Sequence, residues 1–297
     1  IYLETPADKA RGGVLRLMGY GNASGTYGFY TPLSNTSEDF GFARIELTNC
    51  VFLGIGPGVS VRADEFVALG ADNNYLCFLG GDFEVPNGYV FTNMTLRADK
   101  PGSTLSTSLG AADEIVIEQG VPFTINKDFT IAARVRLRPG VTLNHFSGDA
   151  ADTYGYRANL AAAGLAIEAG ASVNLDGRGY TATSGPGKPA DAGKLTRGGT
   201  HGGTARDVGS VLAYGSVPRP ATHGSGGNTS AGGGAAHFVI AGKTIIDGTV
   251  TANGASGNYS GAGGSLWLET GTLEGAATGI IRANGGANNN NQYAAGG

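Results

Sequence analysis

The chain has 297 residues, of which 53 are glycine, well above the usual share of about 7%. Only 15% of the residues are charged and the net charge is −4, which excludes the basic surface of a typical nucleic-acid-binding protein. No apolar run approaches the ~20 residues of a membrane-spanning helix, and two cysteines are too few for a disulfide-rich scaffold.

The composition divides the chain near residue 160. Residues 1–160 contain 20 glycines and are rich in Val, Ile, Phe, Leu and Thr, whereas residues 161–297 contain 33 glycines between short strand-like pieces. We expect irregular β-helix coils in 1–160 and a Gly-rich β-helix module in 161–297, joined as one continuous solenoid. Because the chain has no starting Met and no secretory signal at Ile1, we also expect a part or a processed form of a longer protein.

Short alternating stretches fill the first part. ARIELTNCVFLG, NYLCFLGGDFEV and FTINKDFTIAARVRLRPGVTLN alternate apolar and polar residues, which predicts β-strands. A β-sandwich would also give many short strands. Very short links such as RPGV favour a parallel β-helix, because there the chain turns a corner instead of reversing.

The two cysteines occupy similar settings. Cys50 lies in NCVFLG and Cys77 in LCFLGG, 27 residues later, which is about the length of one coil of a large β-helix. We therefore expect the two to stack on successive coils. A buried ladder of free thiols is favoured, because free cysteine often acts as a small apolar side chain; a disulfide is the alternative in an oxidising compartment.

Acidic residues gather in the turn GDAADTYGYR, which contains Asp149, Asp152 and Arg157. A solvated turn is the simplest interpretation. Many β-helix proteins cleave polysaccharides with grouped charged side chains, so catalysis is an alternative. The two aspartates could also bind Ca²⁺ together with backbone carbonyls, although no full ligand loop is present.

The next stretch, RANLAAAGLAIEAG, has mixed signals. Its start has helical propensity, but Gly164 interrupts it and LAIEAG alternates as a strand does. A helical turn near residues 157–163 stays open as an alternative.

Residues 184–234 form a Gly-rich insertion between strand-like modules. A flexible linker is one interpretation. Because strands lie on both sides, we favour an ordered loop against the flank of the solenoid, anchored by VLAYGS with Tyr214. His201 and His223 are expected to bond loop backbone; the alternative is a metal site with Asp207, but the spacing is not that of a metal pair.

A repeated unit follows. Residues 165–179, 243–257 and 266–286 each give a strand, a Gly-containing turn and a second strand that ends in Asp-Gly or Asn-Gly. These dipeptides favour positive φ and tight turns. Asn253-Gly254 and Asn284-Gly285 are 31 residues apart and are expected to be structural positions. Self-similarity of this length indicates a solenoid.

Aromatic residues are the candidate ligand-binding groups. In LWL, Leu266 and Leu268 would share one face of a strand and Trp267 would point the other way. Trp267 is expected to pack under the Gly-rich insertion or a neighbouring chain; alternatively it is a platform for a sugar ring. Tyr214, Tyr154 and Tyr156 are the other candidates for sugar binding.

The order of motifs between residues 165 and 290 carries a family resemblance. ASVNLDGRGYTATSGPG is followed by GGTHGG, AYGSVPRPATHGSGG and then two stretches that end in ANGASG and ANGG. This order resembles a glycine-rich β-helix module of very large, repetitive bacterial surface or secreted proteins. The resemblance covers under half of the chain and implies architecture and location more than activity.

The sequence thus predicts an all-β protein, a right-handed parallel β-helix with an ordered Gly-rich insertion. The expected function is a non-catalytic structural or adhesive segment of an extracellular or cell-surface protein or filament. Its partners would be other copies or adjacent modules that stack end to end, and surface glycans, without nucleic acid, membrane span or cofactor. The alternative is a polysaccharide-binding or polysaccharide-cleaving β-helix. A third hypothesis, a face that binds ice or a crystal, would need regular rows of Thr-X-Thr, which the sequence does not suggest beyond STLSTS.

Overall fold

The structure is a computed structural model. It describes residues 2–3, 12–19, 31–33, 39–49, 51–70, 74–189, 198–204 and 213–287. These residues form 23 β-strands and one short 3-10 helix, η1 (Gly110–Ala112), with no α-helix among them. A helix long and apolar enough to cross a membrane is likewise absent from the described part. The predicted all-β class is confirmed.

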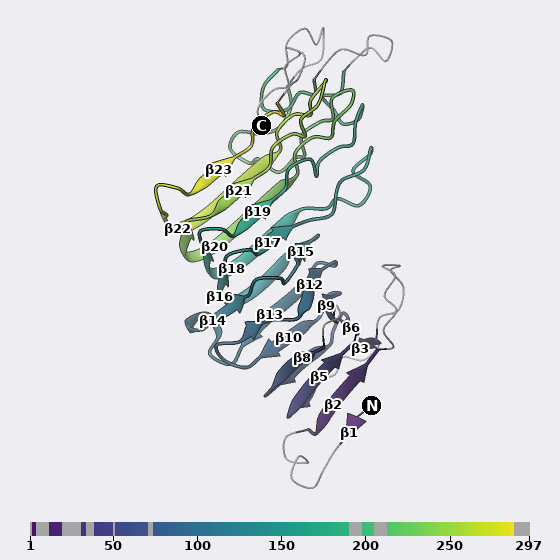
Figure 1. The fold of residues 1–297 in the computed structure, drawn as a ribbon, viewed down its shortest axis with the longest axis vertical. Coiled ribbons are helices and arrows are strands. Elements are labelled where there is room, and N and C mark those ends of the chain that lie inside the picture. The colour runs from purple at the N-terminus through teal and green to yellow at the C-terminus, as the bar shows by residue number, and fades with distance from the viewer. Residues whose placement is uncertain are drawn as a thin grey trace.

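The strands belong to three sheets (Figure 1). The four-stranded sheet contains β1 (Tyr2–Leu3), β2 (Val14–Met18), β5 (Arg44–Thr48) and β8 (Phe66–Leu69). The ten-stranded sheet contains β4 (Asp39–Phe42), β7 (Ser60–Ala63), β10 (Asp82–Val85), β11 (Val90–Phe91), β13 (Ser103–Thr107), β14 (Glu114–Ile117), β16 (Phe129–Leu137), β18 (Ala158–Ile167), β20 (Ala235–Ile246) and β22 (Ser265–Glu274). The nine-stranded sheet contains β3 (Thr31–Leu33), β6 (Phe52–Ile55), β9 (Asn74–Phe78), β12 (Met94–Ala98), β15 (Phe123–Ile125), β17 (Thr142–Asn144), β19 (Ser172–Asn174), β21 (Thr249–Thr251) and β23 (Ile280–Arg282).

Strand pairing is parallel throughout these sheets except between β1 and β2. From β3 onward the chain passes repeatedly between the sheets, so that most strands bond to the equivalent strand of the next pass. We call one such pass a coil. Up to β15 a coil contains three short strands; from β16 onward the first two merge into one long strand, because β16 pairs with both β13 and β14. This arrangement is consistent with a β-solenoid.

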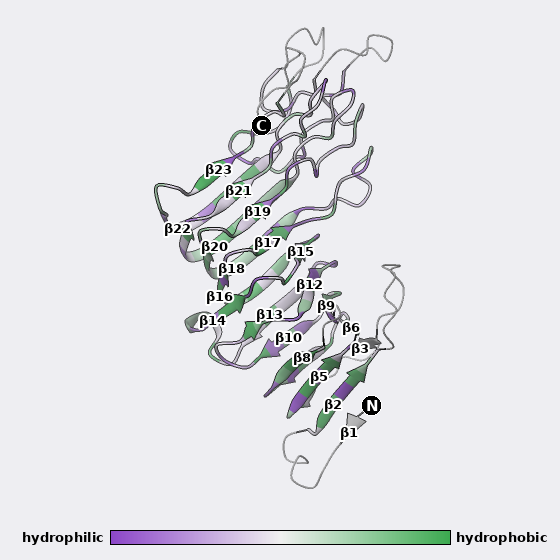
Figure 2. Ribbon diagram, in the orientation of Figure 1, coloured by the Kyte–Doolittle hydropathy of each residue, from purple (hydrophilic) through white to green (hydrophobic). Residues whose placement is uncertain are grey.

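Apolar side chains line the inner faces of the sheets. Along the nine-stranded sheet one inward ladder joins six consecutive strands through buried residues: Leu76, Leu96, Phe123, Leu143, Val173 and Val250. Burial alternates along β16, so every second side chain faces the core. Hydrophobic colouring in Figure 2 accordingly concentrates on the strands.

The long strands change register in the middle. The register between β16 and β18 shifts between Ile131 and Arg134. Gly164 of β18 pairs with Arg134, where the pairing resumes. The suggested helical turn at 157–163 is wrong, because those residues lie in or next to β18 and are buried alternately. Both large sheets also continue past residue 160 without a break.

The corner that follows each strand of the nine-stranded sheet varies in length along the chain. It takes residues 126–128 after β15, 145–157 after β17, 175–234 after β19 and 252–264 after β21. The later loops gather on one side of the stack (Figure 1). The Gly-rich insertion, residues 184–234, belongs to the corner after β19, and its described parts lie within this group of loops.

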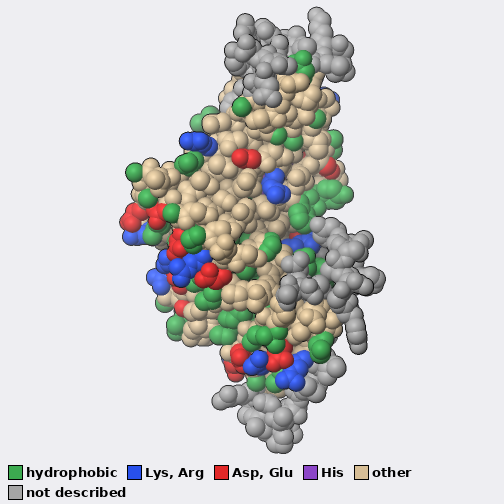
Figure 3. All heavy atoms as spheres, viewed as in Figure 1, with side chains coloured by type: hydrophobic (Ala, Val, Ile, Leu, Met, Phe, Trp, Pro, Cys, Tyr) green, Lys and Arg blue, Asp and Glu red, His purple; other side chains and the backbone are tan. Residues whose placement is uncertain are grey.

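Backbone packs directly on backbone in this group. A Cβ atom on Gly232 would lie 1.8 Å from the carbonyl oxygen of Gly224, and one on Gly179 would lie 2.2 Å from that of Gly233. Hydrogen bonds link the same segments, for example from Gly179 N to Gly232 O at 2.7 Å. Glycine is needed here because nothing larger permits so close an approach. Figure 3 shows few charged side chains at this end of the molecule.

Candidate functional site

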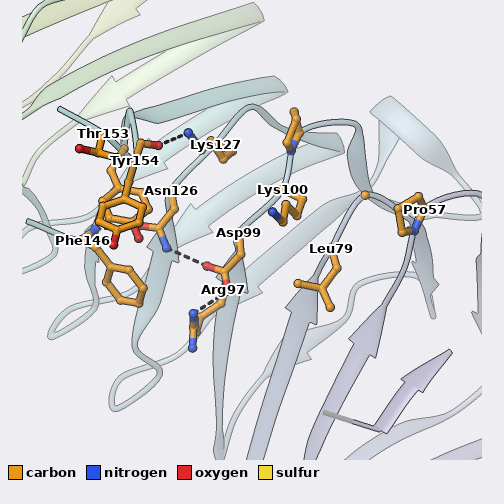
Figure 4. A pocket seen from close by; sticks show the side chains of 13 residues that line it. Pro57, Leu79, Arg97, Asp99, Lys100, Asn126, Lys127, Phe146, Thr153 and Tyr154 are labelled. Carbon is orange, nitrogen blue, oxygen red and sulfur yellow. Dashed lines mark hydrogen bonds and ion pairs between the residues drawn. The ribbon is translucent and has the colours of Figure 1, made fainter. Parts of the chain in front are cut away.

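A groove of about 920 Å³ runs beside the nine-stranded sheet. Residues from the corners after β6, β9, β12, β15 and β17 line it. In Figure 4, Pro57 and Leu79 lie toward one end, and Phe146 and Tyr154 lie at the other. The groove therefore follows the direction in which the coils stack.

A chain of polar groups forms the middle of the groove. Arg97, which is 6% exposed, donates to Asp99 at 2.5 Å. The buried Asn126 donates its Nδ2 to Asp99 at 2.7 Å and accepts the backbone N–H of Phe146 at 2.7 Å. Asp99, Asn126 and Phe146 thus tie three successive coils together. The guanidinium of Arg97 also lies over the ring of Phe146, 4.9 Å from its centroid.

Aromatic rings close one end of the groove. Tyr154 and Tyr156 stack nearly parallel, with centroids 5.2 Å apart, and Tyr156 meets the edge of Phe146 at 5.6 Å. Lys127 lies 5.9 Å from the Tyr156 ring and donates to the backbone oxygens of Tyr154 and Gly155. Tyr154 is 58% exposed. Two of the predicted sugar-binding residues are therefore brought together here.

Trp267 lies far along the chain from this groove, on β22. Its ring stacks on His237, with centroids 3.9 Å apart, and the register pairs the two residues. His237 Nε2 is 2.6 Å from Glu269 Oε1. Leu266 and Leu268 pack against the core as expected. A histidine from the preceding coil is thus the stacking partner of Trp267, and cover by the Gly-rich insertion or another chain stays a prediction.

Tyr214 anchors the described end of the insertion. Its hydroxyl donates to the backbone oxygen of His223 at 2.5 Å and accepts from Ser225 Oγ at 2.8 Å. Burial raises the pKa of the hydroxyl. His201 meets the Tyr214 ring edge-on at 4.8 Å and bonds to Thr222 at 2.8 Å. The hydroxyl of Tyr214 thus holds the loop, and the residue also lines a second cavity together with His201 and Leu266.

Two buried histidines stack behind the groove, with centroids 5.4 Å apart. His145 accepts the N–H of Ala235 on Nε2 at 3.2 Å, so its Nδ1 carries the proton and donates to Phe146 O at 2.5 Å. Burial, together with the nearby His223, lowers the pKa of His145 to about 3. The ring therefore holds two loops in its neutral form.

His223 belongs to a charged cluster. Its Nε2 is 2.8 Å from the backbone oxygen of Tyr156, and Arg157 lies within hydrogen-bonding distance. Burial and the charge of Arg157 lower the pKa of His223 to about 4. Burial alone would raise the pKa of Asp152, but the bidentate pairing with Arg157, at 2.6 and 3.1 Å, lowers it.

The acidic turn shows no free catalytic pair. Asp152 is bound to Arg157, and Asp149 accepts backbone N–H groups of Ala151 and Thr153 at 3.1 and 2.8 Å. In the described residues there is no group of three or more His, Cys, Asp or Glu side chains that could hold a metal ion. Asp207, the suggested metal partner of the histidines, lies outside the described residues.

Cys77 does not stand in a cysteine ladder. The register places it between Gly54 of β6 and Arg97 of β12. It is a buried free thiol, and burial raises its pKa to about 12. Cys50 lies outside the described residues. The spacing suggested stacking, but the coils here are shorter than 27 residues, so the register pairs Cys77 with a different position.

The Asp-Gly and Asn-Gly turns stack on one another. Asn253 donates its backbone N–H to Asp176 at 2.7 Å, and Asn284 donates its own to Asn253 Oδ1 at 2.9 Å. Gly254 N in turn donates to Asn284 O. Gly254 has no positive φ; its Cβ would lie 1.9 Å from Gly261 O. The close approach of the backbone, and not the turn geometry, therefore explains why residue 254 is a glycine. Gly285 lies next to these residues.

Short rows of hydroxyl and amide side chains also occur on the outer face of the nine-stranded sheet. Thr142 and Ser172 bond at 3.0 Å, and Thr249 follows in register. The rows cross three coils, TLN, SVN and TVT. Sequence reasoning missed them because the residues of one row are scattered along the chain.

Arg97, Asn126 and Phe146 were also missed as site residues. Asp99 and Asn126 each follow directly after a strand of the nine-stranded sheet, which is the signal that could have found them. Comparison with known proteins gives no match, whether to a family model, a curated sequence or a solved structure.

Proposed function

We propose that this chain is a structural and adhesive segment of an extracellular surface protein or filament. The observation that supports this proposal is the parallel pairing in the ten-stranded and nine-stranded sheets, where each coil is hydrogen-bonded to the next along one axis. Among the described strands, β22 and β23 lie at the ends of their sheets, where a further coil or another copy can pair with the outer backbone groups. The resemblance of residues 165–290 to glycine-rich modules of bacterial surface proteins supports the same location.

The proposal includes a right-handed parallel β-helix. Parallel strands of one sheet that are joined by a crossover have right-handed connections in nearly all proteins. The chain returns to each sheet through such crossovers, for example from β16 through β17 to β18. A right-handed stack is therefore the expected hand for this topology.

Electron microscopy of the native material, at the cell surface and after purification, tests this proposal. Rods or filaments with an axial repeat are the expected result. Compact, separate particles in both preparations would contradict it.

Polysaccharide recognition is the second candidate function. The stacked Tyr154 and Tyr156 at the end of a groove favour binding. Polysaccharide cleavage has less support, because Asp149 accepts backbone N–H groups of its own loop and Asp152 is paired with Arg157.

A further inference from the structure

We propose that the groove beside the nine-stranded sheet binds a linear acidic polysaccharide whose uronate-type units lie along the stack. This inference gives the second candidate function a site and a ligand class. It does not depend on rod formation, because the groove lies within one chain.

The shape of the groove fits a polymer. Its lining comes from corners after five successive strands, β6, β9, β12, β15 and β17. Neighbouring strands lie about 4.8 Å apart, so four spacings give a length of about 19 Å. A site of this length exceeds one sugar ring, so it can hold several units of a linear chain.

The charge of the lining fits an anion. Arg97, Lys100 and Lys127 are the basic side chains of the lining, and Asp99 is its acidic one. Asp99 is paired with Arg97. Lys127 bonds to backbone oxygens, which leave its charge in place, and Lys100 is exposed. Two positive charges therefore face the groove without a carboxylate opposite them in the described lining.

The aromatic end fits a sugar ring. One face of Tyr154 lies on Tyr156, and the 58% exposure of Tyr154 leaves the ring accessible to a ligand. Tyrosine combines an apolar ring with a polar hydroxyl, which suits the C–H face and hydroxyl rim of a sugar. Asn126 and Asp99, which hydrogen-bond each other, lie between this end and Lys100 (Figure 4).

Two other polymers fit less well. A peptide that adds a strand needs a free sheet edge, but each of the five strands beside the groove is already paired on both sides. A nucleic acid brings one phosphate per nucleotide and binds through many cations, whereas the described lining offers two lysines without a carboxylate partner. An acidic glycan is the favoured ligand.

Calorimetric titration of the 297-residue chain with polygalacturonate and with its fully methyl-esterified form is the test. The acidic polymer should bind at least about tenfold more tightly than the ester. Tyr154→Ala and Lys100→Gln should each weaken binding at least about fivefold, the equivalent of ~1 kcal/mol. Binding should also weaken as salt rises, because the contacts involve exposed charges.

Matched variants separate this effect from unfolding. Tyr154→Phe keeps the ring and should bind as the wild type does, and Lys188→Gln removes an exposed lysine outside the groove lining. Melting temperatures should stay unchanged in all four variants. Equal binding of acid and ester, unchanged binding by Tyr154→Ala, no binding of polygalacturonate, or equally tight binding of polyglutamate would each overturn the proposal. Microscopy of Tyr154→Ala tests rod formation separately.

Discussion

At the scale of single residues, the buried histidines make the protein sensitive to acid. His145 and His223 have pKa values of about 3 and 4 in the folded chain, against about 6.5 when unfolded. Between pH 6.5 and 4 the unfolded state therefore binds more protons, so the free energy of unfolding falls as the pH is lowered. Their contribution is complete above about pH 6.5 and is lost progressively as the pH falls, down to about pH 4 for His223 and about pH 3 for His145.

Urea unfolding from pH 7 to pH 4.5 measures this effect. The wild type should lose stability across that range, and His145→Gln should show a smaller slope, although it starts from a lower stability at pH 7. Carboxylates titrate in both proteins, so the difference between the two slopes isolates the histidine. Parallel slopes would show that protonation of His145 is not coupled to unfolding.

Sequence reasoning at this scale found some positions and missed others. Tyr154 and Tyr156 stand out because aromatic residues are rare in polar turns. Arg97 and Asn126 looked ordinary, since their role depends on which corner lies above which. That register follows from coil lengths, and these change along the chain. The change in coil length also explains why the predicted cysteine ladder was wrong, because the register pairs Cys77 with Gly54.

At the scale of elements, the loops on the long corner pack through glycine. Gly232→Ala would place a Cβ 1.8 Å from the carbonyl oxygen of Gly224, and backbone cannot move aside as a flexible side chain can. We expect a loss of about 1–3 kcal/mol in the free energy of unfolding. Chemical denaturation of the purified variant measures it.

Gly41→Ala is the matched control for this loss. It lies on β4, and a Cβ there would meet no atom within 4 Å. We expect it to change stability by less than about 1 kcal/mol. If both variants behaved alike, the close approach of the loops would not contribute to stability.

The strands of residues 161–297 could be predicted from the sequence, whereas the packing of the loops between them could not. The 31-residue repeat located the pairs β20–β21 and β22–β23, because alternation and Asn-Gly turns recur together. The Ala-rich start of β18 suggested a helical turn, since alanine favours helices. Pairing with β16 and β20 overrides that local preference.

At the scale of the whole molecule, each coil is supported by its two neighbours. Stability in such a stack is close to a sum of local and nearest-neighbour contributions. In the isolated 297-residue chain, amide hydrogen exchange should be slowest in the central strands, such as β12, β15 and β16, and faster toward β2 and β23. Exchange measured by mass spectrometry on peptides gives this profile. Uniform protection from end to end would indicate all-or-none unfolding of the complete stack.

The fold class could be predicted at this scale because alternation and short links are properties of the entire chain. The three-sheet arrangement could not, since it depends on where the chain turns from one sheet into the next. Charged side chains of opposite sign adjoin one another on the surface (Figure 3), as Arg136 does between Glu114 and Glu168 on adjacent coils. Such pairs support the register without determining it.

The difference in length between the two corners of each coil has a consequence for the evolution of this sequence. The links after the long strands keep to residues 138–141, 168–171, 247–248 and 275–279, while the opposite corner extends from 126–128 to 175–234. Insertions in that corner leave strand pairing intact, as β18 and β20 show across the longest one. The groove, the histidine cluster and the glycine-packed loops all lie there. Insertions can therefore lengthen this one side without disturbing the strands, whereas the links after the long strands stay between two and five residues long.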